Sequence, residues 1–224
     1  MKIIHVFFAA LFFLNVGCED ESSSDVELWG KCYSIADTDS LNLSIQQLTG
    51  TIPPDLGKLT NLTFLSLATN QLTGPIPKEI GNLTNLIKLN LGQNQLTGPI
   101  PQEISNLVNM THLQLWYNQF TGEIPPEIWN LNNLEGLGLA SNQLKGEIPQ
   151  EIGNLTNLTG LNLSSNQLTG KIPDTLCDIY GKLTITQSTL DIYNMDDIVE
   201  KINEIQKDID GYELPEQTIY EEGM

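Results

Sequence analysis

The fold is decided by residues 62–83, which read LTFLSLATNQLTGPIPKEIGNL. Leu65 and Leu67 alternate with their neighbours, and this period of two predicts a short strand whose leucine side faces the interior. Asn70 then turns the chain. Pro77 suits the start of a short helical turn that carries an anion at its positive end. One unit of the fold is therefore a strand, a turn and a short helical turn.

The same pattern recurs at a constant interval along the chain. The repeated asparagines are Asn70, Asn94, Asn118, Asn142 and Asn166, and Gln46 continues the series backward by the same step. A fixed period of this length is typical of a solenoid. Because an Asn side chain has two donors and an acceptor, it can satisfy backbone groups of its own loop and of the next turn. We therefore predict a structural ladder of asparagines.

The repeats follow the consensus Leu-x-x-Leu-x-Leu-x-x-Asn-x-Leu-Thr-Gly-x-Ile-Pro, with single substitutions such as Phe120. Over about residues 28–190, this pattern closely resembles the plant-type subclass of leucine-rich repeats, which also occurs in bacterial leucine-rich-repeat lipoproteins. The resemblance implies an α/β repeat solenoid, a horseshoe segment with parallel concave β-strands, short convex helical turns and a C-terminal capping helix. It also implies that function resides on the exposed positions of the concave strands.

Residues 1–17 are predicted to be a signal peptide, because the apolar run 3–14 is too short to span a bilayer. Val and Gly directly before Cys18 resemble the lipobox of bacterial lipoproteins, although Asn15 stands where that motif has Leu. The resemblance implies lipidation of Cys18, an acidic and serine-rich tether at 18–27, and a location on a bacterial outer membrane or cell surface. The alternative is a plain secretory signal and a released, extracellular chain.

The other expected segments follow from period and composition. They are an N-terminal cap at 28–39, six 24-residue repeats at 40–177, a degenerate seventh turn at 178–194, a capping helix at 195–210 and an acidic tail at 211–224. Trp29 and Cys32 resemble the tryptophan and the second cysteine of the cap in plant-type relatives, whereas the partner cysteine is missing. Phe120 stands at the Leu72 position and is predicted to lie in the core. Trp129 stands where other turns have a convex glycine, and it is attributed either to drift or to local packing.

The cysteines are predicted to stay unpaired, since lipidation would remove Cys18. Cys32 and Cys177 lie about six turns apart, which is ~29 Å at ~4.8 Å per stacked strand. A disulfide allows only about 7 Å between Cα atoms. No disulfide between these two cysteines, and none within the chain, is therefore expected. Both are expected to be buried thiols, with intermolecular pairing as the alternative.

The net charge of −18 comes from 28 acidic residues against 10 lysines, with no arginine. A polyanionic chain without arginine lacks the electrostatic footprint for nucleic acid, so nucleic-acid binding is excluded. Most acids lie near the two ends, because residues 40–177 carry nine acids and five lysines. Beyond the signal peptide the only histidine is His112, and no metal-ligand spacing or nucleophile motif occurs. The sequence predicts no enzymatic activity, no cofactor and no metal.

The candidate ligand-binding residues are large or polar side chains at exposed positions of the concave strands. They are Phe64, Lys88, Asn90, His112, Gln114, Trp116 and Tyr117. The fourth turn carries most of them, and glycines follow at 136, 138 and 160. Aromatics beside glycines predict a step in the surface, and amphipathic aromatics anchor interfaces or stack sugars. The alternative is that this turn arose by drift and binds nothing.

Two function classes follow from these residues. The first is a membrane-tethered, monomeric, non-catalytic module that binds a protein partner on its concave face, as the resemblance implies. The second is a glycan-binding or adhesive surface protein in which Trp116 and Tyr117 stack pyranose rings. A spacer or an ice-facing surface is less consistent with a concave face that lacks a regular threonine ladder. Asn-x-Ser/Thr sequons leave a secreted, co-receptor-like protein of eukaryotic origin open.

Overall fold

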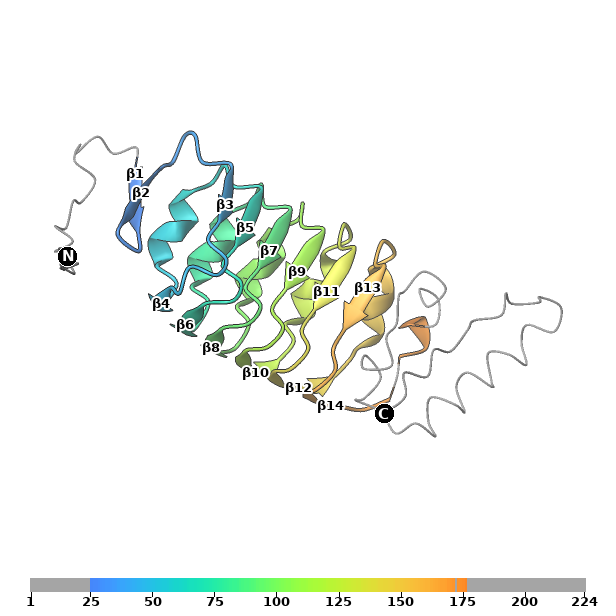
Figure 1. Cartoon of the computed structure of the whole chain (residues 1–224). Coiled ribbons are helices and arrows are strands. Elements are labelled where there is room, and N and C mark those ends of the chain that lie inside the picture. The colour runs from blue at the N-terminus through green and yellow to red at the C-terminus, as the bar shows by residue number, and fades with distance from the viewer. Residues whose placement is uncertain (1–24, 172, 177–224) are drawn as a thin grey trace, which may run out of the picture.

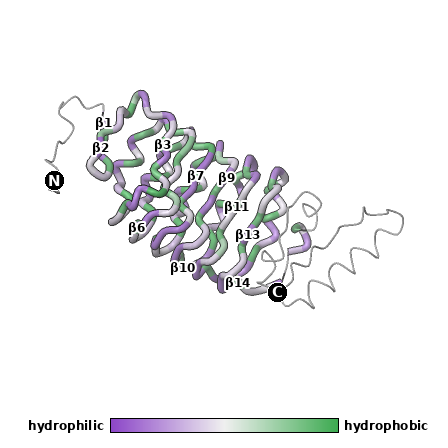
Figure 2. Tube along the Cα trace, in the orientation of Figure 1, coloured by the Kyte–Doolittle hydropathy of each residue, from purple (hydrophilic) through white to green (hydrophobic). Residues whose placement is uncertain are grey.

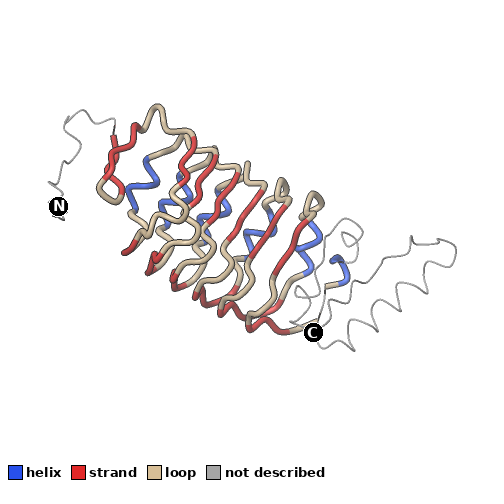
Figure 3. The backbone as a smooth tube through the Cα atoms, in the orientation of Figure 1, coloured by secondary structure: helices blue, strands red, loops and turns tan. Residues whose placement is uncertain are grey.

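The structure is a computed structural model that describes residues 25–171 and 173–176. These residues form an elongated stack of turns (Figure 1), and each turn gives one strand to an inner sheet and one to a second sheet. The first five turns also contain a 3-10 helix, and Figure 3 shows these helices behind the inner strands. The predicted repeat solenoid with parallel strands and short helical turns is confirmed.

The inner sheet corresponds to the predicted concave sheet. Its strands are β3 (Ser40–Asn42), β5 (Phe64–Ser66), β7 (Lys88–Asn90), β9 (His112–Gln114), β11 (Gly136–Gly138) and β13 (Gly160–Asn162). Neighbouring strands pair in parallel, and each residue pairs with the equivalent residue of the next turn, as Phe64 does with Lys88. The central residue of each strand is a buried leucine, such as Leu65. Because side chains alternate along a strand, the flanking residues point outward.

A second parallel sheet was not predicted. Its strands are β4 (Thr49–Gly50), β6 (Gln71–Gly74), β8 (Gln95–Gly98), β10 (Gln119–Glu123), β12 (Gln143–Glu147) and β14 (Gln167–Thr169). Leu72 is buried between the exposed Gln71 and Thr73, so the Gln-Leu-Thr segment alternates like a strand. Neighbouring strands are displaced by two residues, since Thr73 pairs with Gln95. The exposed threonines of this sheet therefore stand beside glutamines and do not form one straight row.

The helical turns are 3-10 helices. They are η1 (Pro54–Lys58), η2 (Lys78–Asn82), η3 (Gln102–Asn106), η4 (Pro126–Asn130) and η5 (Gln150–Asn154). In η2 an extended Pro77 precedes the helix and Glu79 lies in its first turn, as predicted. The backbone N–H of Leu83 donates to Ile80 O at 3.2 Å, three residues back, and this spacing defines a 3-10 helix.

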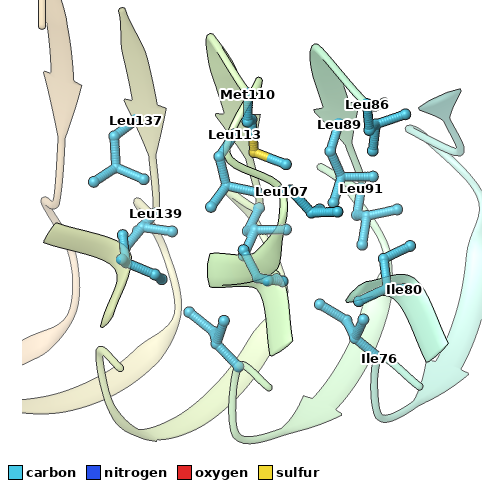
Figure 4. Close-up of a cluster of buried hydrophobic side chains, with 14 of the residues drawn as sticks. Ile76, Ile80, Leu86, Leu89, Leu91, Leu107, Met110, Leu113, Leu137 and Leu139 are labelled. Carbon is cyan, nitrogen blue, oxygen red and sulfur yellow. The ribbon is translucent and has the colours of Figure 1, made fainter. Parts of the chain in front are cut away.

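The core runs the length of the stack as one layer of leucine and isoleucine side chains. Figure 2 shows the hydrophobic positions recurring from turn to turn, and Figure 4 shows Leu89 and Leu113 of the inner strands together with Ile80 of a helix in one cluster. Phe120 is fully buried and lies in the core, as predicted. Trp129 is only 1% exposed and belongs to the core cluster, so its side chain takes part in local packing.

The predicted asparagine ladder is present, with a correction to its direction. The Nδ2 group of Asn118 donates to Leu115 O of its own turn at 3.2 Å and to Leu91 O of the preceding turn at 3.0 Å. Its Oδ1 accepts the N–H of Leu96, also from the preceding turn. The same pattern holds at Asn70, Asn94, Asn142 and Asn166. Each rung therefore fastens its turn to the preceding turn and not to the next.

A β-hairpin caps the first turn. It consists of β1 (Asp25–Leu28) and β2 (Lys31–Ser34), and its buried Val26 and Leu28 join the core. Trp29 and Gly30 form the tight turn, both with positive φ, a geometry that matches the twist of a two-residue hairpin. The cap therefore starts at Asp25, and the last three residues of the predicted tether belong to it.

Cys32 on β2 corrects the prediction of a chain without disulfides. This residue is exposed, and its sulfur is in a disulfide bond. The remaining cysteines, Cys18 and Cys177, lie outside the described residues. The more specific prediction, that Cys32 and Cys177 are not paired, is untested.

Several expected segments fall outside the described residues. They are the signal peptide 1–17, the lipidation site Cys18, most of the tether, the degenerate seventh turn, the capping helix 195–210 and the acidic tail. These assignments stay predictions. Within the described part of the chain, none of the helices has the length and apolar character needed to cross a membrane.

Candidate functional site on the inner sheet

The register of the inner sheet sets the spacing of the predicted binding residues. Phe64, Lys88 and His112 stand in one column, because β5, β7 and β9 pair residue by residue. Adjacent parallel strands are ~4.8 Å apart, so Phe64 lies ~10 Å from His112 with Lys88 between them. Phe64 is therefore separate from the fourth turn. We call His112, Gln114, Trp116 and Tyr117 of that turn the aromatic plate.

The predicted step in the surface is absent at Gly136 and Gly138, because side chains of the plate fill it there. Gly136 and Gly138 are buried, since His112 and Gln114 lie over them. A Cβ at Gly136 would lie 3.0 Å from His112 Cδ2, and a Cβ at Gly138 would collide with Gln114 Oε1. A Cβ at Gly160 would have only one neighbour within 4.0 Å, the backbone oxygen of Glu135, so no side chain covers this glycine. The lower part of the surface thus begins at Gly160, one turn later than predicted.

Trp116 lies over the preceding turn. A Cβ at Gly92 would lie 2.7 Å from Trp116 Cε2, so the indole can rest against that backbone only because residue 92 is glycine. Tyr117 meets the indole edge to face, with ring centroids 5.7 Å apart and an interplanar angle of 81°. This geometry is favourable for two aromatic rings. The indole is therefore held in place from two sides.

Tyr117 projects from the surface because of its backbone. Its φ of 52° lies in the left-handed region, which non-glycine residues seldom occupy. The equivalent residues of the neighbouring turns, Gln93 and Ser141, have the same conformation, so the repeat imposes it. The Tyr117 N–H donates to Ala140 O at 2.9 Å. The ring is 60% exposed and is the largest outward apolar group of the plate.

The polar candidates are partly committed to the fold. Asn90 Oδ1 accepts the Gly92 N–H at 3.0 Å, which occupies one of its two acceptor positions. His112 Nδ1 lies 2.9 Å from Thr111 Oγ1. Lys88 is exposed and is the only lysine or acid in the six inner strands, all of which the structure describes. Its ammonium is thus the only charge that these six strands themselves present to a ligand.

Sequence reasoning missed a second set of asparagines beside the inner strands. They are Asn61, Asn85, Asn109, Asn133 and Asn157, and each donates from Nδ2 to a backbone carbonyl of the preceding turn. Their constant spacing is visible in the sequence, but Asn61, Asn109 and Asn157 were noted only as Asn-x-Ser/Thr sequons. Across residues 25–171 and 173–176, no group of three His, Cys, Asp or Glu side chains could hold a metal ion.

Comparison with known proteins identifies the repeat. The family model for a leucine-rich repeat region matches residues 40–216, and no curated protein matches the chain. The chain is similar to the plant peptide hormone receptor RGFR1 in complex with RGF2, with 45% identity, a TM-score of 0.61, and coverage of 62% of this chain and 22% of that one.

Two other solved structures extend the comparison. A plant ice-binding protein is 37% identical with a TM-score of 0.57, over 71% of this chain and 48% of that one. The leucine-rich repeat ectodomain of the receptor kinase SOBIR1 from Arabidopsis thaliana is 37% identical with a TM-score of 0.54, over 58% of this chain and 70% of that one. The chain thus spans about a fifth of RGFR1 and about half of the ice-binding protein.

The family assignment rests on sequence and geometry together. The family model covers most of the chain, and the similar structures share its plant-type repeat. The residue-by-residue pairing of the inner strands and the asparagine ladder show the same repeat in the described residues. This chain belongs to the leucine-rich repeat family and has repeats of the plant type.

Proposed function

We propose that this chain is an exported, non-catalytic module that binds a protein or peptide partner on its inner sheet. The aromatic plate is the anchor. The observation that carries the proposal is Trp116, which rests on Gly92 and is held by Tyr117 before any partner arrives. A pre-ordered aromatic costs little conformational entropy on binding, and Trp and Tyr dominate the binding energy of interfaces.

The similar structures support a protein partner in a limited way. RGFR1 is described as a plant peptide hormone receptor, and its structure contains RGF2. The SOBIR1 structure is described as the leucine-rich repeat ectodomain of a receptor kinase. The ice-binding protein shows that a related repeat serves another purpose. Ice binding is less consistent with this chain, because its exposed threonines alternate with glutamines and Lys145 replaces one of them. The inner sheet, with its aromatic plate, is therefore a better candidate binding surface than the second sheet.

Trp116→Ala is expected to weaken binding of a peptide partner about 30-fold, since loss of a central aromatic anchor costs about 2 kcal/mol. The probe is a peptide selected on the wild-type full chain from a displayed random library, and its Kd is measured by calorimetry. Gly92→Ala should also weaken binding, because the new methyl group displaces the indole without removing it.

The matched control is Glu151→Gln, an exposed acid in the first turn of η5 on the helical side, which should leave the Kd unchanged. Circular dichroism checks that each variant is folded. Selection of no peptide, or equal Kd values for wild type and both plate variants, would remove the plate from the proposal. A glycan array with the same proteins tests the alternative: sugar binding lost in Trp116→Ala would favour the glycan-binding protein.

Whether the chain is anchored to a membrane by a lipid on Cys18 depends on which cysteine is disulfide-bonded to Cys32. Cys177 directly follows Leu176, which is buried in the last described turn, whereas Cys32 belongs to the cap at the other end. About six strand spacings of ~4.8 Å separate the two ends, far beyond the reach of a disulfide. By elimination we propose that Cys18 is the partner. Since a sulfur in a disulfide cannot also carry a lipid thioether, the released form is favoured over the lipidated, membrane-tethered form.

Mass spectrometry of the mature chain separates the two forms. Under non-reducing conditions we expect a peptide pair joined through Cys18 and Cys32 and no acyl mass on either peptide. Reduction should release both peptides. A diacylglyceryl group on Cys18 would show instead that the chain is a lipoprotein, and the Cys32 thiol would then be expected to react with an alkylating reagent.

A further inference from the structure

We propose that the partner places a cationic side chain in a second site, an open groove at the rim of the inner sheet. The groove holds about 700 Å³ and extends from the loop after β2 across the next three turns. Its principal lining residues are Asp37, Asp39, Asn61, Asn85, Asn109 and Ile87. We call it the rim groove. This inference rests on the proposed function, because it names the chemistry of the same partner.

The asparagines of the rim groove have fixed orientations. Asn61 Nδ2 donates to Ala36 O at 2.8 Å, and Asn85 Nδ2 donates to Thr60 O at 2.9 Å. Asn109 repeats this bond one turn later. In the described residues, no hydrogen bond reaches the Oδ1 atoms of these three asparagines. Successive turns are ~4.8 Å apart, so the groove carries an evenly spaced row of carbonyl acceptors.

The hydroxyl groups of the groove are used as donors inside the fold. Thr63 Oγ1 donates to Asp39 O at 3.0 Å, and Thr111 Oγ1 lies within reach of Ile87 O and His112 Nδ1. Both hydroxyl oxygens keep lone pairs for a ligand. Asn61 Nδ2 also donates to Ile35 O at 3.4 Å, so the remaining free donors are one N–H each on Asn85 and Asn109, and acceptors outnumber donors along the groove.

The rim groove is also negatively charged, so its charge and its excess of acceptors favour the same kind of ligand. Two carboxylates, Asp37 and Asp39, stand at its N-terminal end, and no lysine lines it. Ser34 Oγ donates to Asp37 at 2.8 Å, which fixes that carboxylate in place. An acceptor-rich, negative groove is complementary to a cation with several N–H donors, such as a lysine ammonium or an arginine guanidinium. It is a poor site for a phosphate or a carboxylate, which bring only acceptors.

An apolar patch in the groove suits the stem of such a side chain. Ile87 is 39% exposed, unusual for an isoleucine, and it stands between Thr63 and Thr111 in the repeat. The methylene stem of a lysine or arginine can cover this surface while its charged head reaches the carboxylates. A neutral sugar would satisfy the acceptors but would leave the two charges without a counterpart.

The rim groove and the aromatic plate are joined by one contact, the 2.9 Å approach of Thr111 Oγ1 to His112 Nδ1. Thr111 lines the groove and His112 belongs to the plate. A single extended segment could therefore place an apolar or aromatic residue on Trp116 and a basic residue in the groove. The two carboxylates of the N-terminal cap, Asp37 and Asp39, thus place a local negative site beside the nearly neutral repeats.

The test uses the full chain and an acetylated, amidated pentalysine peptide followed by NMR. We expect the side-chain amide signals of Asn61, Asn85 and Asn109 to shift on titration. Asp39→Asn should raise the Kd for these shifts about three-fold, the size of one exposed charge interaction. Glu151→Gln on η5 removes the same charge outside the groove and should leave the Kd at these signals unchanged.

Other results would overturn the rim groove. They are pentalysine shifts confined to residues outside the groove, an unchanged Kd in Asp39→Asn, or shifts of the three asparagines by a cello-tetrasaccharide but not by pentalysine. Trp116→Ala is expected to leave the pentalysine shifts intact, because the groove does not need the indole. Failure of the plate and failure of the groove are therefore distinguishable.

Discussion

Replacing Asn118 with alanine is expected to lower the free energy of unfolding by about 4 kcal/mol, since a buried group left without a partner costs about 1–3 kcal/mol and each further hydrogen bond that is lost costs about 1 kcal/mol. The variant would leave the Leu96 N–H unpaired. The carbonyls of Leu91 and Leu115 would each lose one of two donors, because Asn94 and Asn142 still reach them. Asn118 is only 9% exposed, so water cannot easily replace its amide. Urea unfolding of the full chain, followed by circular dichroism, measures the change.

Gln46 offers a matched control in the same column. It is exposed, and its side chain donates only to Ser44 O at 3.2 Å. Gln46→Ala should therefore change the free energy of unfolding by no more than about 0.5 kcal/mol. If Asn118→Ala were as mild as Gln46→Ala, the asparagine ladder would not be a major source of stability in this solenoid.

The inner strands and the helical turns could be predicted because their signals are local. Leu65 and Leu67 alternate within one strand, and Pro77 and Glu79 mark a helix start within one turn. The direction of the asparagine ladder could not be predicted in the same way. The Asn70 amide could bond equally well to the preceding turn or to the following turn. Only the stacking of the turns determines that it donates to Leu43 O of the preceding turn.

The second sheet was missed because the leucine in its strands was attributed only to the core. The segment is short, and a single Leu72 between Gln71 and Thr73 gives too little alternation to predict a strand. Its hydrogen bonds go to other turns, and the register of this sheet differs by two residues from the period of the sequence. A displacement of this kind depends on the shape of the whole turn, which a repeat alignment does not contain.

The aromatic plate could be predicted as a group of residues, but not as a surface. The period of the repeat places His112, Gln114 and Trp116 on one strand and its exit, and this is confirmed. The burial of Gly138 depends on which way the Gln114 side chain lies over its neighbour, and this is not encoded in spacing. The disulfide of Cys32 was likewise missed, because lipidation was assumed for Cys18.

Trp129→Ala is expected to be the most destabilising change on the helical side, with a loss of about 3–5 kcal/mol, as for other buried tryptophans. The indole is 1% exposed on η4. Glycine holds the equivalent position in η2, where a Cβ at Gly81 would lie 2.6 Å from Glu103 O of the next turn. Since η4 packs less closely against η3 and η5 than η2 packs against its neighbours, the indole occupies space that other turns lack.

Restoring the glycine of the repeat tests this explanation. Trp129→Gly should destabilise at least as much as Trp129→Ala, because the spacing around η4 is set by the indole and a cavity would remain. Ser105→Gly, one turn earlier in the same column, should cost about 1 kcal/mol or less, since Ser105 makes only a local bond to Gln102 O. The measurement is the Tm of the full chain, with an expected fall of about 10 °C for both Trp129 variants. A Tm close to wild type for Trp129→Gly would mean that the turns close the gap and that the tryptophan, though buried, arose by drift.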